Sequence, residues 1–354
     1  MSIRMKLPLC IAATSVAAFL LVSTAFASEV PCTSAEDSVA FSFVVLGCNR
    51  VDRADTNTEV NPSTANLAQL DRTFEEVQQL SPKPTFLFMA GDLVMGYQAD
   101  TNKLAAELMA WRKHYEQSTI AKSGITLVAI PGNHETQNAE RTAIAPSEQQ
   151  WLKVMAPYIR GNNGPGVGGA DNLKTDQSRL TYSFDYTDTH FITLNTDPVG
   201  QDAHLPVKWI AKDLARAHAA GAKHIFAIGH KPAYAYNGKI SDGLVEDNRN
   251  EFWSALEGAH GEAMLSAHNH IYTRIQPRGK TWMIIAGNGG SLLEKGAATD
   301  QQFYGYTLIS IMKNGTVQAK SYGRRIPEEG YFAAAPATTY PTTVRDSLDI
   351  TWKY

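Results

Sequence analysis

The chain has 354 residues, of which 44% are hydrophobic and 19% are charged. This composition is typical of a globular protein with a sizeable core, and it excludes a disordered, collagen-like or coiled-coil chain. With 32 Lys and Arg against 35 Asp and Glu, the formal net charge is −3, and no basic block indicates a nucleic-acid partner. Three cysteines are too few for a disulfide-rich scaffold.

The first 27 residues have the pattern of a secretory signal peptide. Arg4 and Lys6 precede an apolar stretch, residues 7–22, and a small-x-small cleavage site ends at Ala27. An uncleaved membrane anchor is the alternative, but the stretch is shorter than the ~20 residues that a span needs. We therefore expect a secreted or periplasmic protein with no membrane attachment after cleavage.

In the first half of the mature chain, short apolar runs alternate with amphipathic helices. Residues 39–46, 85–89 and 125–130 are predicted to be buried strands. Four helices are predicted. One begins at Asn61-Pro62 and another at a capping box formed by Ser147 and Gln150. The other two span residues 104–115 and 205–220. A glycine-rich segment, residues 161–171, is predicted to be a loop.

Strands predominate in the second half of the chain. They are predicted at residues 180–184, 191–195, 224–228, 263–266, 282–286, 306–311 and 316–322. Two sheets packed face to face, with helices outside, satisfy this order of elements. We expect residues 28–354 to form a single domain with a C-terminal arm from about Arg325.

Polar residues follow four of the predicted strands, and strand ends at one edge of a sheet converge in space. Carboxylate, imidazole and amide groups are ligands of Zn, Fe or Mn. Each block alone is weak, since Gly-Asp is usually a turn and a buried His usually belongs to a core. Their joint occurrence predicts a metal site. The blocks are Gly91-Asp92, Gly132-Asn133-His134-Glu135, Gly229-His230-Lys231-Pro232 and Ala267-His268-Asn269-His270.

Together the blocks resemble the signature of the calcineurin-like metallophosphoesterase superfamily. The run HNHIYTR, residues 268–274, is similar to the last block of purple acid phosphatases. The resemblance implies an α/β fold, a four-layer α/β/β/α sandwich of two mixed β-sheets flanked by helices. It implies two transition metal ions (Zn, Fe or Mn) and hydrolysis of a small phosphoester by a metal-bound hydroxide. Mono- or diesterase activity, metal identity and oligomeric state stay open.

The resemblance also implies a role for each block residue. Asp92 would bridge the two metals. Asn133, His230 and His268 would complete one metal site, and His270 would belong to the other. His134 would bind phosphate or protonate the leaving group, and Asn133 would lie beside it at the substrate.

The first block departs from the family pattern. Cys48-Asn49-Arg50 stands where the family has Asp-x-His or Asp-x-Gly. A Cys48 thiolate is a competent ligand of Zn or Fe, but a disulfide with Cys32 or a free thiol, with Asp52 as a substitute carboxylate, are open alternatives. Arg50 cannot bind a metal, although its guanidinium can hold a phosphate oxygen.

A second departure concerns the aromatic ligand of purple acid phosphatases. Those proteins carry Tyr three residues after the bridging Asp, where this chain has Met95, and Tyr97 lies two residues further on. We therefore expect no tyrosinate-to-iron charge transfer. Ala267, where a Gly is usual, is a milder change.

Two other interpretations of function stay open. The first is a non-catalytic or mononuclear member of the same fold that binds a phosphate ligand, because the first block is altered. The second is a different secreted metallohydrolase, although the sequence has neither the His-Glu-x-x-His of zincins nor the Gly-x-Ser-x-Gly of serine hydrolases.

Overall fold

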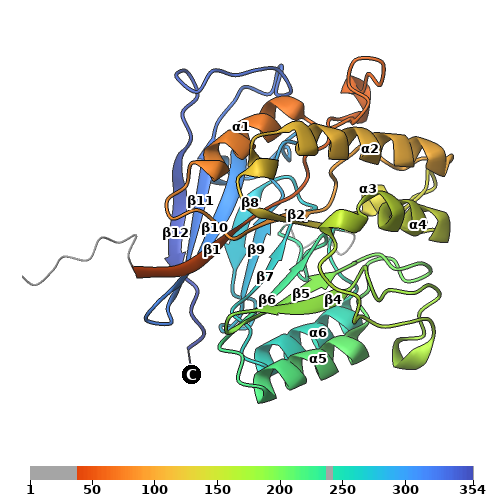
Figure 1. The fold of residues 1–354 in the computed structure, drawn as a ribbon, viewed down its shortest axis with the longest axis vertical. Helices are drawn as coiled ribbons and strands as arrows, with labels where there is room; N and C mark the ends of the chain where they lie inside the picture. Colours follow the sequence, from red (N-terminus) through yellow and green to blue (C-terminus); the bar gives the residue numbers. More distant parts are fainter. Residues whose placement is uncertain (1–37, 237–241, 354) are drawn as a thin grey trace, which may run out of the picture.

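The computed structural model describes residues 38–236 and 242–353. Two six-stranded sheets pack face to face, and helices cover the outer face of each (Figure 1). The fold is the predicted α/β sandwich of four layers. The predicted signal peptide, residues 1–27, and Cys32 lie outside the described residues.

The first sheet has the strand order β12-β11-β10-β1-β2-β3. Adjacent strands β1, β2 and β3 are parallel, whereas β10, β11 and β12 are joined to the sheet antiparallel. The three parallel strands therefore end at the same edge. The strands span Val39–Leu46 (β1), Phe86–Ala90 (β2), Thr126–Ile130 (β3), Tyr304–Met312 (β10), Val317–Arg324 (β11) and Thr343–Asp349 (β12).

The second sheet has the order β4-β5-β6-β7-β9-β8. Its four central strands are parallel, and β4 and β8 are antiparallel strands at the two edges. The strands span Tyr182–Tyr186 (β4), Thr189–Leu194 (β5), His224–Gly229 (β6), Ala263–Ser266 (β7), Tyr272–Ile275 (β8) and Trp282–Ala286 (β9).

The helices divide between the two outer faces. Helices α1, α2 and α4 pack on the first sheet, and α5 and α6 pack on the second (Figure 1). The one-turn helix α3 directly follows β3. The helices span Leu67–Gln78 (α1), Thr101–Gln117 (α2), Asn133–Thr136 (α3), Ala145–Val154 (α4), Val207–Ala219 (α5) and Glu246–Gly258 (α6).

Strand β1 shows how the layers are held together. Successive side chains of a strand point to opposite faces, so Phe43 and Val45 enter the core between the sheets while Val44 and Leu46 pack under the helices. All four are fully buried. Burial on both faces explains why this strand is an uninterrupted apolar run.

Aromatic rings fill the core between the two sheets. The Phe43 ring contacts the rings of Phe191 and Phe226 edge to face, with centroids 5.1 Å apart in each case. Such pairs contribute about 0.5–1.5 kcal/mol beyond their buried area. This core fixes the two sheets, and thereby their edges, relative to one another.

Two predicted helix starts are wrong. Helix α1 is capped by Asn66, whose side chain accepts the Gln69 N–H at 3.3 Å, and not by Asn61, whose amide donates to the Ala65 carbonyl at 2.7 Å. Helix α4 begins at Ala145, so Ser147 lies inside its first turn and forms no capping box.

The C-terminal segment returns over α1 before it forms β12. The Tyr331 carbonyl accepts from the side-chain amides of Asn66 at 3.3 Å and Gln69 at 3.2 Å, and the Tyr331 hydroxyl accepts the Asp52 N–H at 2.6 Å. Strand β12 then pairs with β11 at the sheet edge. Among residues 38–236 and 242–353, no helix combines the length and the apolar character that crossing a bilayer requires.

Candidate metal centre

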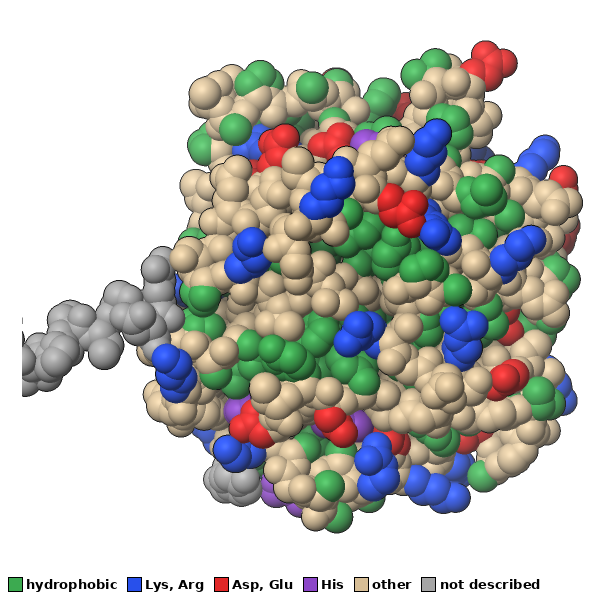
Figure 2. Space-filling view, in the orientation of Figure 1, with side chains coloured by type: hydrophobic (Ala, Val, Ile, Leu, Met, Phe, Trp, Pro, Cys, Tyr) green, Lys and Arg blue, Asp and Glu red, His purple; other side chains and the backbone are tan. Residues whose placement is uncertain are grey.

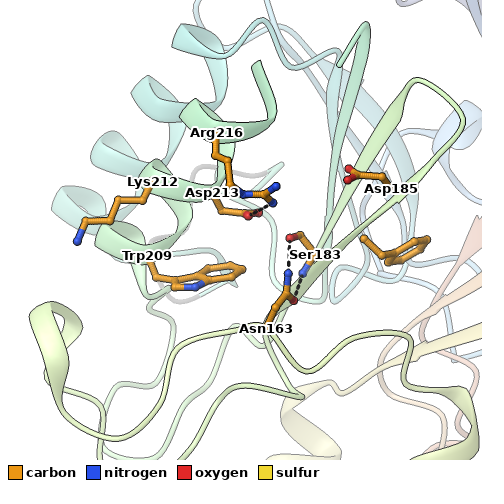
Figure 3. A pocket seen from close by; sticks show the side chains of 8 residues that line it. Asn163, Ser183, Asp185, Trp209, Lys212, Asp213 and Arg216 are labelled. Carbon is orange, nitrogen blue, oxygen red and sulfur yellow. Dashed lines mark hydrogen bonds and ion pairs between the residues drawn. The ribbon is translucent and has the colours of Figure 1, made fainter. Parts of the chain in front are cut away.

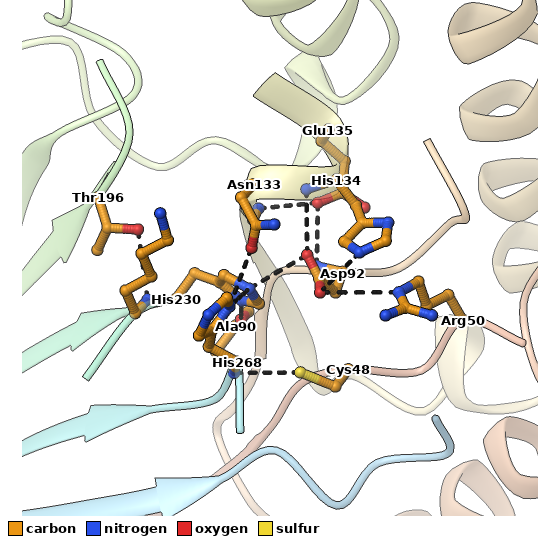
Figure 4. Close-up of polar contacts among 12 residues, drawn as sticks. Cys48, Arg50, Ala90, Asp92, Asn133, His134, Glu135, Thr196, His230 and His268 are labelled. Carbon is orange, nitrogen blue, oxygen red and sulfur yellow. Dashed lines mark hydrogen bonds and ion pairs between the residues drawn. The ribbon is translucent and has the colours of Figure 1, made fainter. Parts of the chain in front are cut away.

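The predicted site lies where strands of both sheets end at one edge of the sandwich (Figure 4). Cys48, Asp92 and Asn133 follow β1, β2 and β3 of the first sheet, and His230 and His268 follow β6 and β7 of the second. The two halves of the chain therefore supply one cluster of side chains.

Three of these residues have unusual backbone conformations. Cys48, Asp92 and His268 have φ angles of 56°, 57° and 66°, in the left-handed region that residues with a Cβ seldom adopt. Such conformations cost of order 1–3 kcal/mol each and concentrate at functional sites. The loops also approach closely, because a Cβ added to Gly91 would lie 2.6 Å from His230 Nδ1. The glycine before Asp92 is thus required by packing.

The cluster centres on three potential ligands. The Cys48 sulfur, an Asp92 carboxylate oxygen and a His230 ring nitrogen all lie within 4.8 Å of one another. Asp92 Oδ1 is 3.1 Å from His230 Nε2. His268 Nδ1 lies 3.2 Å from the same His230 nitrogen and 3.0 Å from Asn133 Oδ1. Five of the six predicted ligand residues thus form one contiguous group.

The sixth, His270, lies outside the tight group and is partly buried, two residues after His268. Its Nδ1 is 2.8 Å from the Leu292 carbonyl, just as His230 Nδ1 is 2.8 Å from the Ala90 carbonyl. Because a carbonyl can only accept, Nδ1 carries a proton in both rings, which leaves Nε2 as the ring nitrogen that could bind a metal. Metal-bound histidines are commonly oriented in this way.

His134 lies beside the cluster. Its backbone N–H donates to Asp92 Oδ1 at 3.2 Å, and its Nε2 is 3.7 Å from Asp92 Oδ2. Its Nδ1 contacts the Met95 carbonyl, and its ring packs against Tyr97 with centroids 3.9 Å apart. His134 is therefore held at the edge of the Asp92 carboxylate.

Comparison with known proteins identifies the family. The model of the calcineurin-like phosphoesterases matches residues 46–272, a range that contains every predicted site residue from Cys48 to His270. The chain belongs to the calcineurin-like phosphoesterase family.

Two curated relatives of this calcineurin-like phosphoesterase come from Arabidopsis thaliana. The chain is 22% identical to "Probable inactive purple acid phosphatase 9" over 260 residues. This alignment covers 68% of the chain and 37% of the relative. The chain is 24% identical to "Purple acid phosphatase 23" over 192 residues. This alignment covers 52% of the chain and 37% of the relative. The chain thus spans 37% of the length of either relative.

Solved structures show the same fold. Purple acid phosphatase PPD1 from yellow lupin (Lupinus luteus) seeds superposes with a TM-score of 0.57 at 15% identity, over 89% of this chain and 54% of that one. GAP50, described as the anchor in the inner membrane complex of Plasmodium, superposes with a TM-score of 0.52 at 14% identity, over 89% of both chains. A dimetal phosphatase from Danio rerio gives 0.50 at 11% identity, over 89% of this chain and 100% of that one.

The electrostatics of the site fit a bound cation. Burial, together with Asp92, raises the pKa of the Cys48 thiol well above its ordinary value. Burial also acts to raise the pKa of Asp92, but the adjacent His134 and His230 outweigh it and hold that pKa well below the usual range. A buried sulfur, carboxylate and imidazole facing one another are a donor set that suits Zn or Fe, and a metal would stabilise the thiolate.

Arg50 brings a positive charge to the same site. Its side chain is 13% exposed, and its Nε lies 3.9 Å from Asp92 Oδ2. One terminal nitrogen donates to the Val51 carbonyl at 3.3 Å, but the buried Nε has no hydrogen-bond partner in the described part of the chain. The guanidinium therefore places a positive charge directly beside Asp92.

Glu135 is a site residue to which the sequence assigned no role. Its buried carboxylate accepts four backbone N–H groups, and burial raises its pKa to about 7. It thereby clamps the Asp92 loop against the start of α3. The donors and their distances are Asp92 at 2.9 Å, Leu93 at 2.7 Å, Val94 at 3.2 Å and Gly132 at 2.8 Å.

Tyr97 also reaches the site despite its unfavourable spacing. Its hydroxyl accepts a hydrogen bond from the Asn133 side-chain amide. That contact turns the amide oxygen of Asn133 toward His268. Tyr97 therefore orients a predicted ligand residue, whereas Met95 contributes only its backbone carbonyl, which contacts His134.

A separate pocket of about 470 Å³ lies between α5 and β4 (Figure 3). Trp209, Asp213 and Arg216 of α5 face Ser183 and Asp185 of β4 across it. None of the predicted site residues lines this pocket, so it plays no part in the metal centre.

Proposed function

We propose that the chain is an exported, metal-dependent phosphoester hydrolase with two metal ions at the described cluster. The observation that carries this proposal is the convergence of Cys48, Asp92 and His230 within 4.8 Å at the edge shared by both sheets. Family membership supports the same activity.

In this proposal, the ligands divide between two metal positions. Asp92 would be shared by both positions, and Cys48 and His270 would hold the first metal. Asn133, His230 and His268 would hold the second metal, and the distances of 3.0 Å from His268 to Asn133 and 3.2 Å from His268 to His230 support this grouping.

When bound, the two metals would lower the pKa of a water molecule and neutralise the phosphoryl oxygens. The protein supplies the other elements of the reaction. Arg50 holds a phosphoryl oxygen through its guanidinium, which lies beside Asp92. His134 faces the leaving group, where it binds phosphate or donates a proton from Nε2, the ring nitrogen that lies 3.7 Å from Asp92 Oδ2. Glu135 and Tyr97 keep Asp92 and Asn133 in place.

Export is a further part of the proposal. The charged, apolar and small-residue pattern of residues 1–27 supports a cleaved signal peptide. The N-terminal sequence of protein recovered from the medium or the periplasm tests it, and a mature chain that begins at Ser28 is the expected result.

One alternative function has support of its own. Cys48 replaces the family's carboxylate, one curated relative is named inactive, and a protein of the same fold is described as an anchor. These observations favour a non-catalytic or mononuclear member that binds a phosphate ligand.

Metal content and turnover, measured on the same sample, distinguish the two functions. The purified mature chain is loaded with Zn, Fe or Mn, and its metal content is compared with its hydrolysis of 4-nitrophenyl phosphate and bis(4-nitrophenyl) phosphate. Two metals per chain with turnover support the hydrolase, and the faster substrate identifies mono- or diesterase activity. Phosphate binding without turnover in any metal form supports the binding protein.

A further inference from the structure

Arg141 stands in a tight turn that follows the α3 segment. The Asn138 N–H donates to the Thr142 carbonyl at 3.0 Å, and the Arg141 N–H donates to the Asn138 carbonyl at 3.1 Å. Gln137 and Ala143 form an antiparallel bridge at its base. The turn therefore fixes the direction in which Arg141 leaves the backbone.

The base of this turn is tied to the loop between β5 and α5. The Gln137 amide donates to Asp197 Oδ1 at 3.3 Å, and the Ala143 N–H donates to Asp202 Oδ1 at 3.2 Å. Arg141 itself has a φ of 61°, an unfavourable value for a long side chain. Strain of this kind persists where the surroundings impose it, often at ligand sites.

The turn places the Arg141 guanidinium over the ring of Tyr97. The guanidinium carbon is 3.7 Å from the ring centroid, and the same ring packs 3.9 Å from that of His134. A guanidinium stacked on an aromatic face still presents N–H donors at its edge to a ligand. Arg141 is thus connected through one ring to the residue proposed to face the leaving group.

Arg141 is exposed, and no carboxylate within the described ranges forms an ion pair with it. Arg50 differs, because its side chain is largely buried beside Asp92. One guanidinium therefore lies in the centre of the site, and a second lies at its rim on the side of His134.

We propose that Arg141 forms an anion subsite, and that the preferred substrates are phosphoesters whose leaving group carries a second anionic group. A phosphate and a carboxylate both match the guanidinium fork. The inference rests on the proposed function, since it assigns the transferred phosphoryl group to Arg50 and the leaving group to the side of His134.

The test compares phosphonates that cannot be hydrolysed. Propylphosphonate and 3-phosphonopropionate share a phosphonate and a three-carbon chain, but only the second ends in a carboxylate; propane-1,3-diphosphonate ends in a second phosphonate. Calorimetry on the metal-loaded chain should show about tenfold tighter binding of an analogue with an anionic tail, the range of a hydrogen bond to a charged group. Tighter binding of 3-phosphonopropionate would indicate a carboxylate as the second anionic group, and tighter binding of propane-1,3-diphosphonate would indicate a phosphate.

Arg141→Ala should abolish this preference, and Arg141→Lys should retain part of it. Arg160→Ala is the matched control, because Arg160 is also exposed and lies over a ring, that of Phe184 at 6.0 Å, but acts on no site residue. Thermal midpoints confirm that the variants fold.

The outcomes separate this inference from the proposed function. Equal binding of all analogues by the wild type, or a preference that survives in Arg141→Ala, contradicts the subsite even when hydrolysis is intact. A wild type that shows the preference but hydrolyses no phosphoester supports the subsite and contradicts the proposed function.

Discussion

The backbone N–H of His268 donates a hydrogen bond to the sulfur of Cys48 at 3.1 Å. This contact joins the loop after β7 of the second sheet to the loop after β1 of the first (Figure 4). The residue that departs from the family pattern therefore lies inside the cluster. Its sulfur already accepts one hydrogen bond, which favours the thiolate, while burial opposes it.

We predict that bound metal protects Cys48 from alkylation and that chelation exposes it. A metal-bound thiolate cannot react, whereas the metal-free thiol becomes accessible when the site loosens. Mass spectrometry of iodoacetamide-treated protein, with and without a chelator, measures the difference. Cys48→Asp should keep activity with a preference moved toward Mn, and Cys48→Ala should lose one metal.

Two results would contradict thiolate ligation. A link between Cys48 and Cys32 in a non-reduced peptide map would establish the disulfide instead. Equal alkylation rates with and without metal would leave Cys48 as a free thiol outside the metal sites.

Asp92→Asn should empty at least one metal position. The substitution keeps the size of the side chain but removes the negative charge that the proposal places between two cations. Metal content is measured by atomic emission after gel filtration, with Asp247→Asn, an exposed residue of α6, as the control. Full metal content with normal activity in Asp92→Asn would refute the bridging role.

His134→Ala should lower turnover by roughly 10²-fold or more, the range of general acid–base catalysis. Metal content should stay unchanged, because His134 lies beside the tight ligand group. The two measurements are made on one preparation. Metal loss in this variant would instead make His134 a ligand.

Glu135→Gln should destabilise the metal-free protein by about 1–3 kcal/mol. In the wild type, backbone N–H groups donate to both carboxylate oxygens of Glu135. In the variant, an amide NH₂ replaces one of these oxygens and cannot accept their hydrogen bonds. Urea unfolding measures the change. The exposed Glu75→Gln on α1 should stay within about 0.5 kcal/mol of the wild type. An unchanged midpoint in Glu135→Gln would show that the clamp contributes little.

The stability of the second sheet should depend on pH through His190. Burial lowers the pKa of this fully buried ring, but its hydrogen bonds to Asp213 at 3.0 Å and Asp185 at 2.6 Å outweigh burial and raise that pKa. A raised histidine pKa stabilises the fold fully below the unfolded value of about 6.5 and loses that effect as pH rises through the folded value.

The difference in unfolding free energy between wild type and His190→Gln isolates this contribution. It should be largest below about pH 6.5 and should shrink at higher pH. Urea titrations across this range provide the measurement. A difference that is constant with pH would mean that His190 contributes packing alone.

The strands were the most predictable part of the fold. The prediction of residues 39–46 coincides with β1, because a strand buried on both faces is a continuous apolar run. Strand β12 and helix α6 were missed for the opposite reason. No residue of β12 is buried, and α6 buries only Phe252, Trp253 and Leu256, so neither shows a strong periodic signal.

Contacts between distant loops could not be predicted. Asn66 caps α1 because its side-chain amide also donates to the carbonyl of Gly290 at 2.7 Å, a residue distant in sequence. At the site, residue type and position after a strand indicated the potential ligands. The clamp by Glu135 and the stack of Arg141 on Tyr97 depend on how loops meet, which no local pattern encodes.

The pairing of β1 with β10 has a consequence for the order of folding. Val45 of β1 pairs with Thr307 of β10, so the central strand of the first sheet gains one neighbour only after most of the chain exists. Contacts of such long sequence separation form slowly. An emerging chain that already contains every residue of the candidate site would still lack one neighbour of β1, the strand that Cys48 follows. Assembly of the site should therefore be a late event in folding.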